Sequence, residues 1–178
     1  MEMTRDRTGN DLRRPYETTV TAPSKASSRE IYDVLADLQT HRTWGAGKNG
    51  LQSLTAPPGP AQVGTEFEST GNDPMGPFED RSVVTEARPG ELFEFVTDAH
   101  QRPKKGDAVE WTLVHRYAIT PTDGGSSVTY TNRVTRISGI HGMLRLLNSR
   151  ALAGLMRKMT TSVTRSGLRN LIAHAEKR

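Results

Sequence analysis

The stretch that decides the fold is VEWTLVHRYAITPTDGGSSVTYTNRVTRI, residues 109–137. Apolar or aromatic side chains alternate with polar ones on both sides of the turn sequence Pro-Thr-Asp-Gly-Gly, residues 121–125. Alternation with a period of two residues is typical of a half-buried strand, and a glycine-rich turn between two such runs indicates a hairpin. The sequence therefore predicts a long antiparallel hairpin with one covered face.

The alternation also predicts how the two strands pair. When Ile119 lies opposite Val128, the same face collects three further pairs: Tyr117 with Tyr130, His115 with Asn132, and Leu113 with Val134. The opposite face then carries mostly threonine and arginine, which suits water. A slip of one residue would turn the aromatic rings to solvent, so this register is strongly favoured.

After Gly139 the apolar period becomes helical, which predicts a long amphipathic C-terminal helix. Its apolar stripe is expected to hold Leu152, Leu155, Met156, Met159, Val163, Leu171 and Ile172. Ser162, Ser166 and Gly167 interrupt this stripe, and side chains so small are expected to leave space beneath the helix.

Before the hairpin, residues 1–14 are polar and are predicted to form a disordered tail, with structure from residue 15 to residue 178. A first strand begins at Tyr16, and Ser27 with Glu30 forms a capping box that starts a short helix. A second short helical turn is predicted at His41–Trp44, ahead of a glycine-rich loop.

The middle of the chain is predicted to be a series of strands. Residues 63–69 alternate, with Phe67 on the covered face, and residues 80–97 form a hairpin. The pattern leaves open which pair of that hairpin faces inward: Phe93 with Phe95, or Leu92 with Val96. Residues 99–107 are polar and are expected to form a loop.

These elements predict an α+β domain in which a curved antiparallel sheet of about seven strands surrounds the long C-terminal helix, with two short helices after the first strand. A twisted sheet of this size has to bury one face, and the final helix is the element long enough to cover it. The space between sheet and helix is then a candidate ligand cavity.

Composition narrows the function classes. The chain has 178 residues and no cysteine, and no apolar run approaches the roughly 20 residues of a membrane-spanning helix, so we expect a cytoplasmic protein. Residues 139–178 carry eight Lys and Arg against one acid. We interpret this excess as the solvated face of the helix, with contact to an anionic membrane surface as the alternative.

Several segments together resemble a known family. They are the order of elements, Ile31–Leu38 leading to Trp44, Val63–Thr65, Asp123–Tyr130 and the Leu- and Arg-rich final helix. Over residues 16–177 the chain resembles the SRPBCC (START-like) superfamily, in particular its polyketide cyclase/dehydrase and lipid-transport branch. The resemblance implies a helix-grip fold with a hydrophobic pocket, and it does not choose between carriers, receptors and cyclases.

The candidate site follows from the hairpin register. We expect a small hydrophobic or amphipathic ligand to contact Trp44, Phe67, Phe95, Trp111, Leu113, His115, Tyr117, Tyr130, Asn132, Leu155, Met159 and Val163. His115 with Tyr117 or Tyr130 is the candidate acid and base pair if the protein is a cyclase, an aromatase or a dehydratase. The alternative for His115 and Asn132 is a structural hydrogen bond, because buried polar groups are paired in any case.

Other sites find little support. Residues 45–50 match G-x-G-x-x-G but follow a helix rather than a strand, so no dinucleotide cofactor is expected. The remaining histidines are scattered, so no metal site is expected, and no G-x-S-x-G elbow is present. We expect no specific nucleic acid partner and a monomer or weak dimer, with a chaperone-activating or membrane-surface interaction module as a third possible function.

Overall fold

A computed structural model describes residues 16–45, 51–73, 76–104, 108–138 and 150–178, and within these ranges it leaves undescribed the side chains of residues 16, 73 and 150–159. The expected tail at residues 1–14 and most of the glycine-rich loop lie outside the described residues. So do the side chains of Leu155 and Met159.

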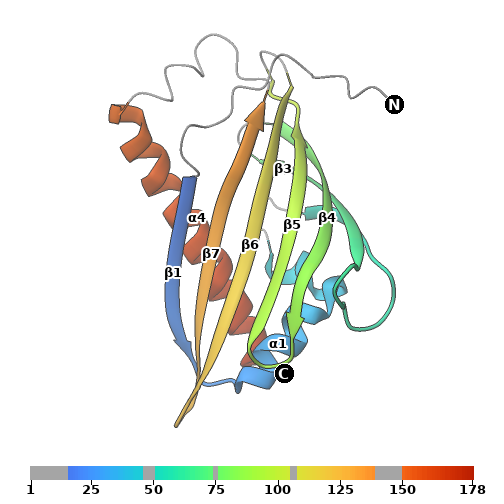
Figure 1. Ribbon diagram of the computed structural model, residues 1–178, viewed down its shortest axis with the longest axis vertical. Helices are drawn as coiled ribbons and strands as arrows, with labels where there is room; N and C mark the ends of the chain where they lie inside the picture. Colours follow the sequence, from blue (N-terminus) through green and yellow to red (C-terminus); the bar gives the residue numbers. More distant parts are fainter. Residues whose placement is uncertain (1–15, 46–50, 74–75, 105–107, 139–149) are drawn as a thin grey trace, which may run out of the picture.

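Seven strands among the described residues form one antiparallel sheet in the order β1-β7-β6-β5-β4-β3-β2 (Figure 1). The strands are β1 (Tyr16–Ser24), β2 (Leu51–Thr55), β3 (Glu66–Asp73), β4 (Gly76–Arg88), β5 (Leu92–Gln101), β6 (Val109–Thr122) and β7 (Gly125–Ser138). The helices are α1 (Ser28–Ala36), the 3-10 turn η1 (Leu38–Thr40), α2 (His41–Trp44) and α4 (Arg150–Ala175). The predicted fold class, a helix-grip sheet closed by the last helix, is confirmed.

The four predicted pairs of the covered face are confirmed, including His115 with Asn132 and Tyr117 with Tyr130. Further along, the pairing shifts so that Thr112 lies opposite Arg136 and Leu113 opposite Val134. The extra residue on β7 is a bulge, which restores Ile137 to the same face as Trp111. We call this face, which α1, α2 and α4 cover, the inner face.

The inner face of β5 was left open by the sequence. Phe93 lies opposite Tyr117 and Phe95 opposite His115, so both phenylalanines face inward. Phe93 is fully buried. Leu92 is also buried, at the end of the hairpin, which is why apolar character alone did not separate the two alternatives.

Helix α1 begins where the sequence predicted. The Ser27 side chain accepts a hydrogen bond from the Glu30 backbone N–H, and the Glu30 carboxylate accepts one from the Ser27 N–H at 2.7 Å. Behind this cap, Ile31, Val34 and Leu35 pack on the inner face.

Figure 1 shows α4 crossing behind β1 and β7 to reach α1. The buried residues of its described part are Thr164, Leu168, Leu171, Ile172 and Ala175. The prediction for Val163 is wrong, because this side chain is 72% exposed. Steps of three and four residues back from Leu171 lead through Leu168 to Thr164, and Val163 lies about 100° away around the helix.

The small residues of α4 also differ from expectation. Ser162 and Ser166 are exposed, and Gly167 has open space where a Cβ would stand. They therefore lie on the side of α4 away from the sheet and leave no space beneath the helix.

Two strand limits were predicted wrongly, and one strand was not predicted. Residues 99–101, expected in a loop, continue β5 and end at the buried Gln101. Val63 lies in a turn before β3 and is 63% exposed. Strand β2 was not predicted, since its five residues show no alternation of buried and exposed positions.

Within the described part of the chain, no helix has the length and apolar character that crossing a membrane requires.

Candidate functional site

The hydrophobic core is divided into two clusters along the inner face. The larger joins α1, α2 and the C-terminal part of α4 to the sheet, and contains Phe67, Phe93, Phe95, Tyr117 and Tyr130. The smaller consists of Val109, Val134 and Ile137, with Trp111 and Leu113 packed against it. The division places polar residues between the clusters.

These polar residues lie on five neighbouring strands, and we call them the polar belt: Thr18, Asn132, His115, Thr97 and Ser82. Thr97 lies opposite Leu113 rather than His115, so the belt steps by two residues between β6 and β5. Thr18 pairs with Asn132 and Asn132 with His115, so the three side chains share one face. On the far side, the hydroxyls of Ser82 and Thr97 hydrogen-bond at 2.9 Å. The belt is a line of hydrogen-bonding groups inside an otherwise apolar layer.

Four rings stand nearly parallel beside the belt. His115 stacks on Phe95 at 4.6 Å between ring centroids, and Tyr117 stacks on Tyr130 at 4.3 Å. His115 and Tyr130 are 6.1 Å apart with an interplanar angle of 18°. The imidazole is thereby fixed in orientation by rings on the two neighbouring strands.

Polar contacts converge on the Tyr130 phenol oxygen. His115 Nδ1 lies 2.8 Å from it and Asn132 Nδ2 donates to it at 3.4 Å. Burial raises the pKa of Tyr130, an effect that hydrogen bonds from Asn132 and Tyr117 partly offset.

His115 is deep in the protein and still accessible. Burial lowers its pKa to about 4, with a smaller contribution from the charge of His41. Yet the side chain is only partly buried by its surface area, as are Trp111, Leu113 and Asn132. We call the place where these four side chains keep accessible surface, between the two clusters, the recess.

A second buried histidine belongs to the same ring cluster. His41 is 4% exposed and its ring lies 4.5 Å from Trp44, 6.1 Å from Phe67 and 6.2 Å from Phe95. Its Nε2 donates to the Leu35 carbonyl at 2.8 Å, and burial lowers its pKa to about 4. Sequence reasoning missed it, although its spacing of three residues from Trp44 on a helical turn placed both rings on one side.

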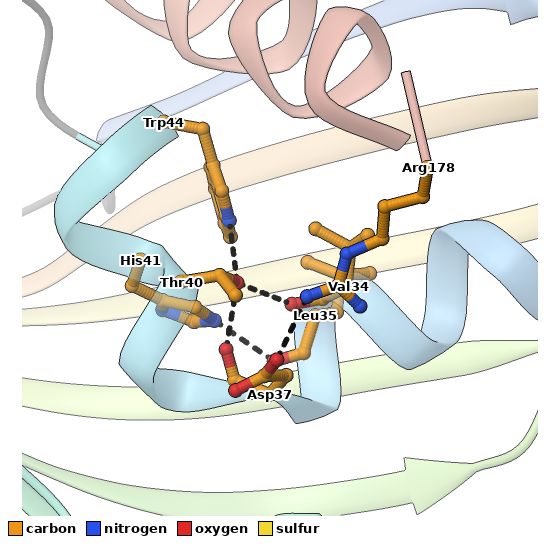
Figure 2. Close-up of polar contacts among 7 residues, drawn as sticks. All are labelled: Val34, Leu35, Asp37, Thr40, His41, Trp44 and Arg178. Carbon is orange, nitrogen blue, oxygen red and sulfur yellow. Dashed lines mark hydrogen bonds and ion pairs between the residues drawn. The ribbon is translucent and has the colours of Figure 1, made fainter. Parts of the chain in front are cut away.

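Figure 2 shows how this end of the site is held. Trp44 Nε1 donates to Thr40 Oγ1 at 3.2 Å, and Thr40 Oγ1 in turn donates to the Asp37 carbonyl at 2.7 Å. Arg178, just beyond α4, binds the Asp37 carboxylate at 2.8 Å. The α1–α2 connection and the end of α4 are therefore tied together beside the aromatic cluster.

Four polar atoms around the recess are buried and have no hydrogen-bond partner among the described residues: Thr18 Oγ1, Asn132 Oδ1, Trp111 Nε1 and Thr164 Oγ1. Thr164 comes from α4, whose end meets the end of β1 where Glu176 accepts from Ser24 Oγ at 3.0 Å. Counted back from that contact, Thr164 lies about 18 Å along the helix and Thr18 about 20 Å along the strand.

The structure brings most of the predicted site residues together. Trp44, Phe67, Phe95, His115, Tyr117, Tyr130 and Asn132 form the ring cluster and its polar edge, while Trp111 and Leu113 belong to the smaller cluster. Val163 points to solvent and takes no part. No group of three or more His, Asp and Glu side chains suited to a metal ion occurs among the residues that the structure describes.

Two pockets open elsewhere on the described surface. One of about 400 Å³ lies between α1 and two turns, at Tyr32, Pro60 and Pro89. The other, of about 150 Å³, lies at Phe78, His100 and Arg102. Neither of these two pockets lies between the sheet and α4.

The comparisons with known proteins agree on the fold. A protein of Rhizobium leguminosarum aligns with a TM-score of 0.66 and 14% identity over 93% of this chain and 97% of its own. The di-domain ARO/CYC StfQ of the steffimycin biosynthetic pathway aligns with a TM-score of 0.65 and 16% identity over 92% of this chain and 52% of its own. Ara h 8.0201 aligns with a TM-score of 0.56 and 10% identity over 93% of this chain and 100% of its own.

At such identities these structures establish the fold alone. No curated protein matches the sequence significantly. The family that matches is described as polyketide cyclase / dehydrase and lipid transport, and the match runs over residues 16–176. Since this covers the whole sheet and α4, the chain belongs to the polyketide cyclase/dehydrase and lipid transport family within the SRPBCC superfamily.

Proposed function

We propose that the protein binds a small apolar or amphipathic molecule on the inner face, in the recess between the two hydrophobic clusters and beneath α4. The observation that carries this proposal is the partial accessibility of Trp111, Leu113, His115 and Asn132, which lie together on the inner face beside the buried ring cluster. Rings and aliphatic groups on both sides supply apolar surface, and the polar belt supplies a few groups that orient a guest.

The unpartnered atoms support the same proposal. A buried hydroxyl or amide without a hydrogen bond costs about 1–3 kcal/mol, so a site shaped for stability alone would carry apolar residues there. Thr18, Thr164 and Asn132 instead leave oxygen atoms without partners among the described residues. A bound molecule that hydrogen-bonds to them offsets this cost.

Leu113 and Val114 offer a matched pair of variants, because they are neighbours on β6 with side chains on opposite faces. The test uses N-phenyl-1-naphthylamine, a neutral dye that fluoresces in apolar surroundings. Leu113→Trp fills the recess and is expected to abolish the fluorescence gain, whereas Val114→Trp keeps it. Equal binding by both variants would contradict the proposal, provided both unfold cooperatively.

The second candidate is a cyclase that uses His115 and Tyr130 as base and acid, favoured by the 2.8 Å contact between His115 Nδ1 and the phenol oxygen. The direction of the pKa shifts opposes it in the free protein. An imidazole with a pKa of about 4 is a weak base at neutral pH, and burial makes the Tyr130 phenol a weaker acid. For this reason binding is the first proposal.

A linear β-polyketone thioester would test the cyclase candidate. Cyclisation that is faster with the protein than without it, and lost in both His115→Ala and Tyr130→Phe, would support it. A rate that the protein leaves unchanged, or that survives in His115→Ala, would remove it.

A further inference from the structure

We infer that the polar belt selects an uncharged molecule by one hydroxyl group, which donates to Asn132 Oδ1 and lies between the hydroxyls of Thr18 and Thr164. This inference rests on the proposed function, since it names the class of molecule that the recess accepts. Asn132 is then a residue that determines specificity rather than part of a catalytic pair.

Within the described structure, the amide group of Asn132 has one satisfied and one unsatisfied end. Its Nδ2 donates to Tyr130, which leaves Oδ1 facing away from that contact, buried and without a partner among the described residues. A carbonyl oxygen only accepts hydrogen bonds. The group that satisfies Oδ1 must therefore carry a proton, which a ketone, an ester or an ether does not.

The two threonines of the site are both buried. Thr18 is 5% exposed and Thr164 is 2% exposed, and neither hydroxyl has a partner among the described residues. Thr18 lies directly across from Asn132 in the β1–β7 register, and Thr164 is buried on α4, the helix that packs against β1 and β7. A threonine hydroxyl can donate, so a ligand hydroxyl whose single proton goes to Asn132 Oδ1 can accept a hydrogen bond from it.

The charged side chains of the described residues lie away from the recess. Every lysine and arginine whose side chain the structure describes is exposed, so none of them faces the recess. The described inner-face carboxylate nearest in the register, Asp80, has an interaction of its own and lies three strands from Asn132, about 14 Å or more away. Among the side chains that the structure describes, a carboxylate or phosphate bound at the belt would find no counter-ion, and burying an unpaired charge is strongly unfavourable.

Three probes of one ring system separate these chemistries by isothermal titration at neutral pH: 2-naphthol, 2-methoxynaphthalene and 2-naphthoate. The wild-type protein is expected to bind 2-naphthol at least about tenfold more tightly than either of the others. In Asn132→Leu, the affinity for 2-naphthol is expected to exceed that for 2-methoxynaphthalene by about twofold or less. Thr164→Val, which changes a hydroxyl for a methyl group, should reduce the preference in the same direction, which keeps the test valid if Asn132→Leu does not fold.

Thr120→Val is the matched control, because Thr120 lies on the exposed face of β6 and should leave all three affinities unchanged. Equal affinity for 2-naphthol and 2-methoxynaphthalene, or tightest binding of 2-naphthoate, would overturn the inference while the proposed function stands, as long as Leu113→Trp blocks binding. Binding of none of the three probes would overturn the proposed function and the inference with it.

Discussion

His115 Nδ1 and the phenol oxygen of Tyr130 lie 2.8 Å apart on the neighbouring strands β6 and β7, at the edge of a layer of parallel rings. Burial favours the neutral form of both groups. The pair therefore acts as a fixed, uncharged polar surface on which Asn132 is positioned, and the predictions below follow from that role.

Tyr130→Phe removes the oxygen on which these contacts converge. We expect a loss of about 1–3 kcal/mol in the free energy of unfolding, because His115 Nδ1 and Asn132 Nδ2 are left inside the protein without it. Urea denaturation measures the change. Tyr32→Phe is the matched control and should change stability by less than about 0.5 kcal/mol, while an equal effect of both variants would contradict the role given to Tyr130.

Stability should depend on pH through the two buried histidines. Each has a pKa of about 4 in the folded protein against 6.5 ordinarily, so between these values the unfolded chain binds more protons. The free energy of unfolding therefore does not depend on these histidines above pH 6.5. As the pH drops from about 6.5 to about 4, it falls by up to about 1.4 kcal/mol per pH unit for each histidine. The slope is smaller for His115, whose side chain is partly accessible.

His115→Asn should make the free energy of unfolding less dependent on pH, because up to one proton fewer is taken up on unfolding. Urea denaturation at several pH values across the window measures this slope. The comparison concerns the slope and not the absolute stability, so a general destabilisation does not affect it. An unchanged slope would mean that His115 is not held neutral by its surroundings.

Thr164→Val tests whether the belt is maintained for a ligand. Removing a buried hydroxyl that has no partner among the described residues is expected to raise the free energy of unfolding by about 1 kcal/mol, and at the same time to weaken 2-naphthol binding. Thermal denaturation and titration of one preparation give both values. A variant that is destabilised, or that binds unchanged, would contradict a ligand role for Thr164.

The end of the hairpin should tolerate a side chain at one glycine and not at its neighbour. Gly125 has φ +143°, and a Cβ there would meet the Ser24 carbonyl oxygen and lie 2.9 Å from Lys25 Cα. Gly125→Ala is therefore expected to cost about 2 kcal/mol or more. Gly124→Ala, where nothing lies within 4 Å, is the control, and equal stability of both variants would contradict this packing.

The hairpin could be predicted because two constraints agree: the alternation assigns the faces, and the turn at residues 121–125 fixes the register. The β7 bulge was not predictable, because one extra residue leaves both flanking runs alternating. It explains how Ile137, three residues beyond Val134, returns to the same face.

The C-terminal helix was predicted correctly, and Leu171 and Ile172 of its expected apolar stripe are buried. The prediction failed at Val163, because the buried position there is its polar neighbour Thr164. A single threonine on a buried stripe gives no sequence signal of its own. His41 was missed for a related reason, because its neighbours Phe67 and Phe95 come from distant strands.

The most direct test of the central claim is a crystal structure of the protein grown with 2-naphthol. We expect ring density between β6, β7 and α4, with the hydroxyl oxygen within about 3.2 Å of Asn132 Oδ1 or the hydroxyls of Thr18 and Thr164. Density confined to the outer pocket at Tyr32, Pro60 and Pro89, with the inner face closed over by protein side chains, would contradict it.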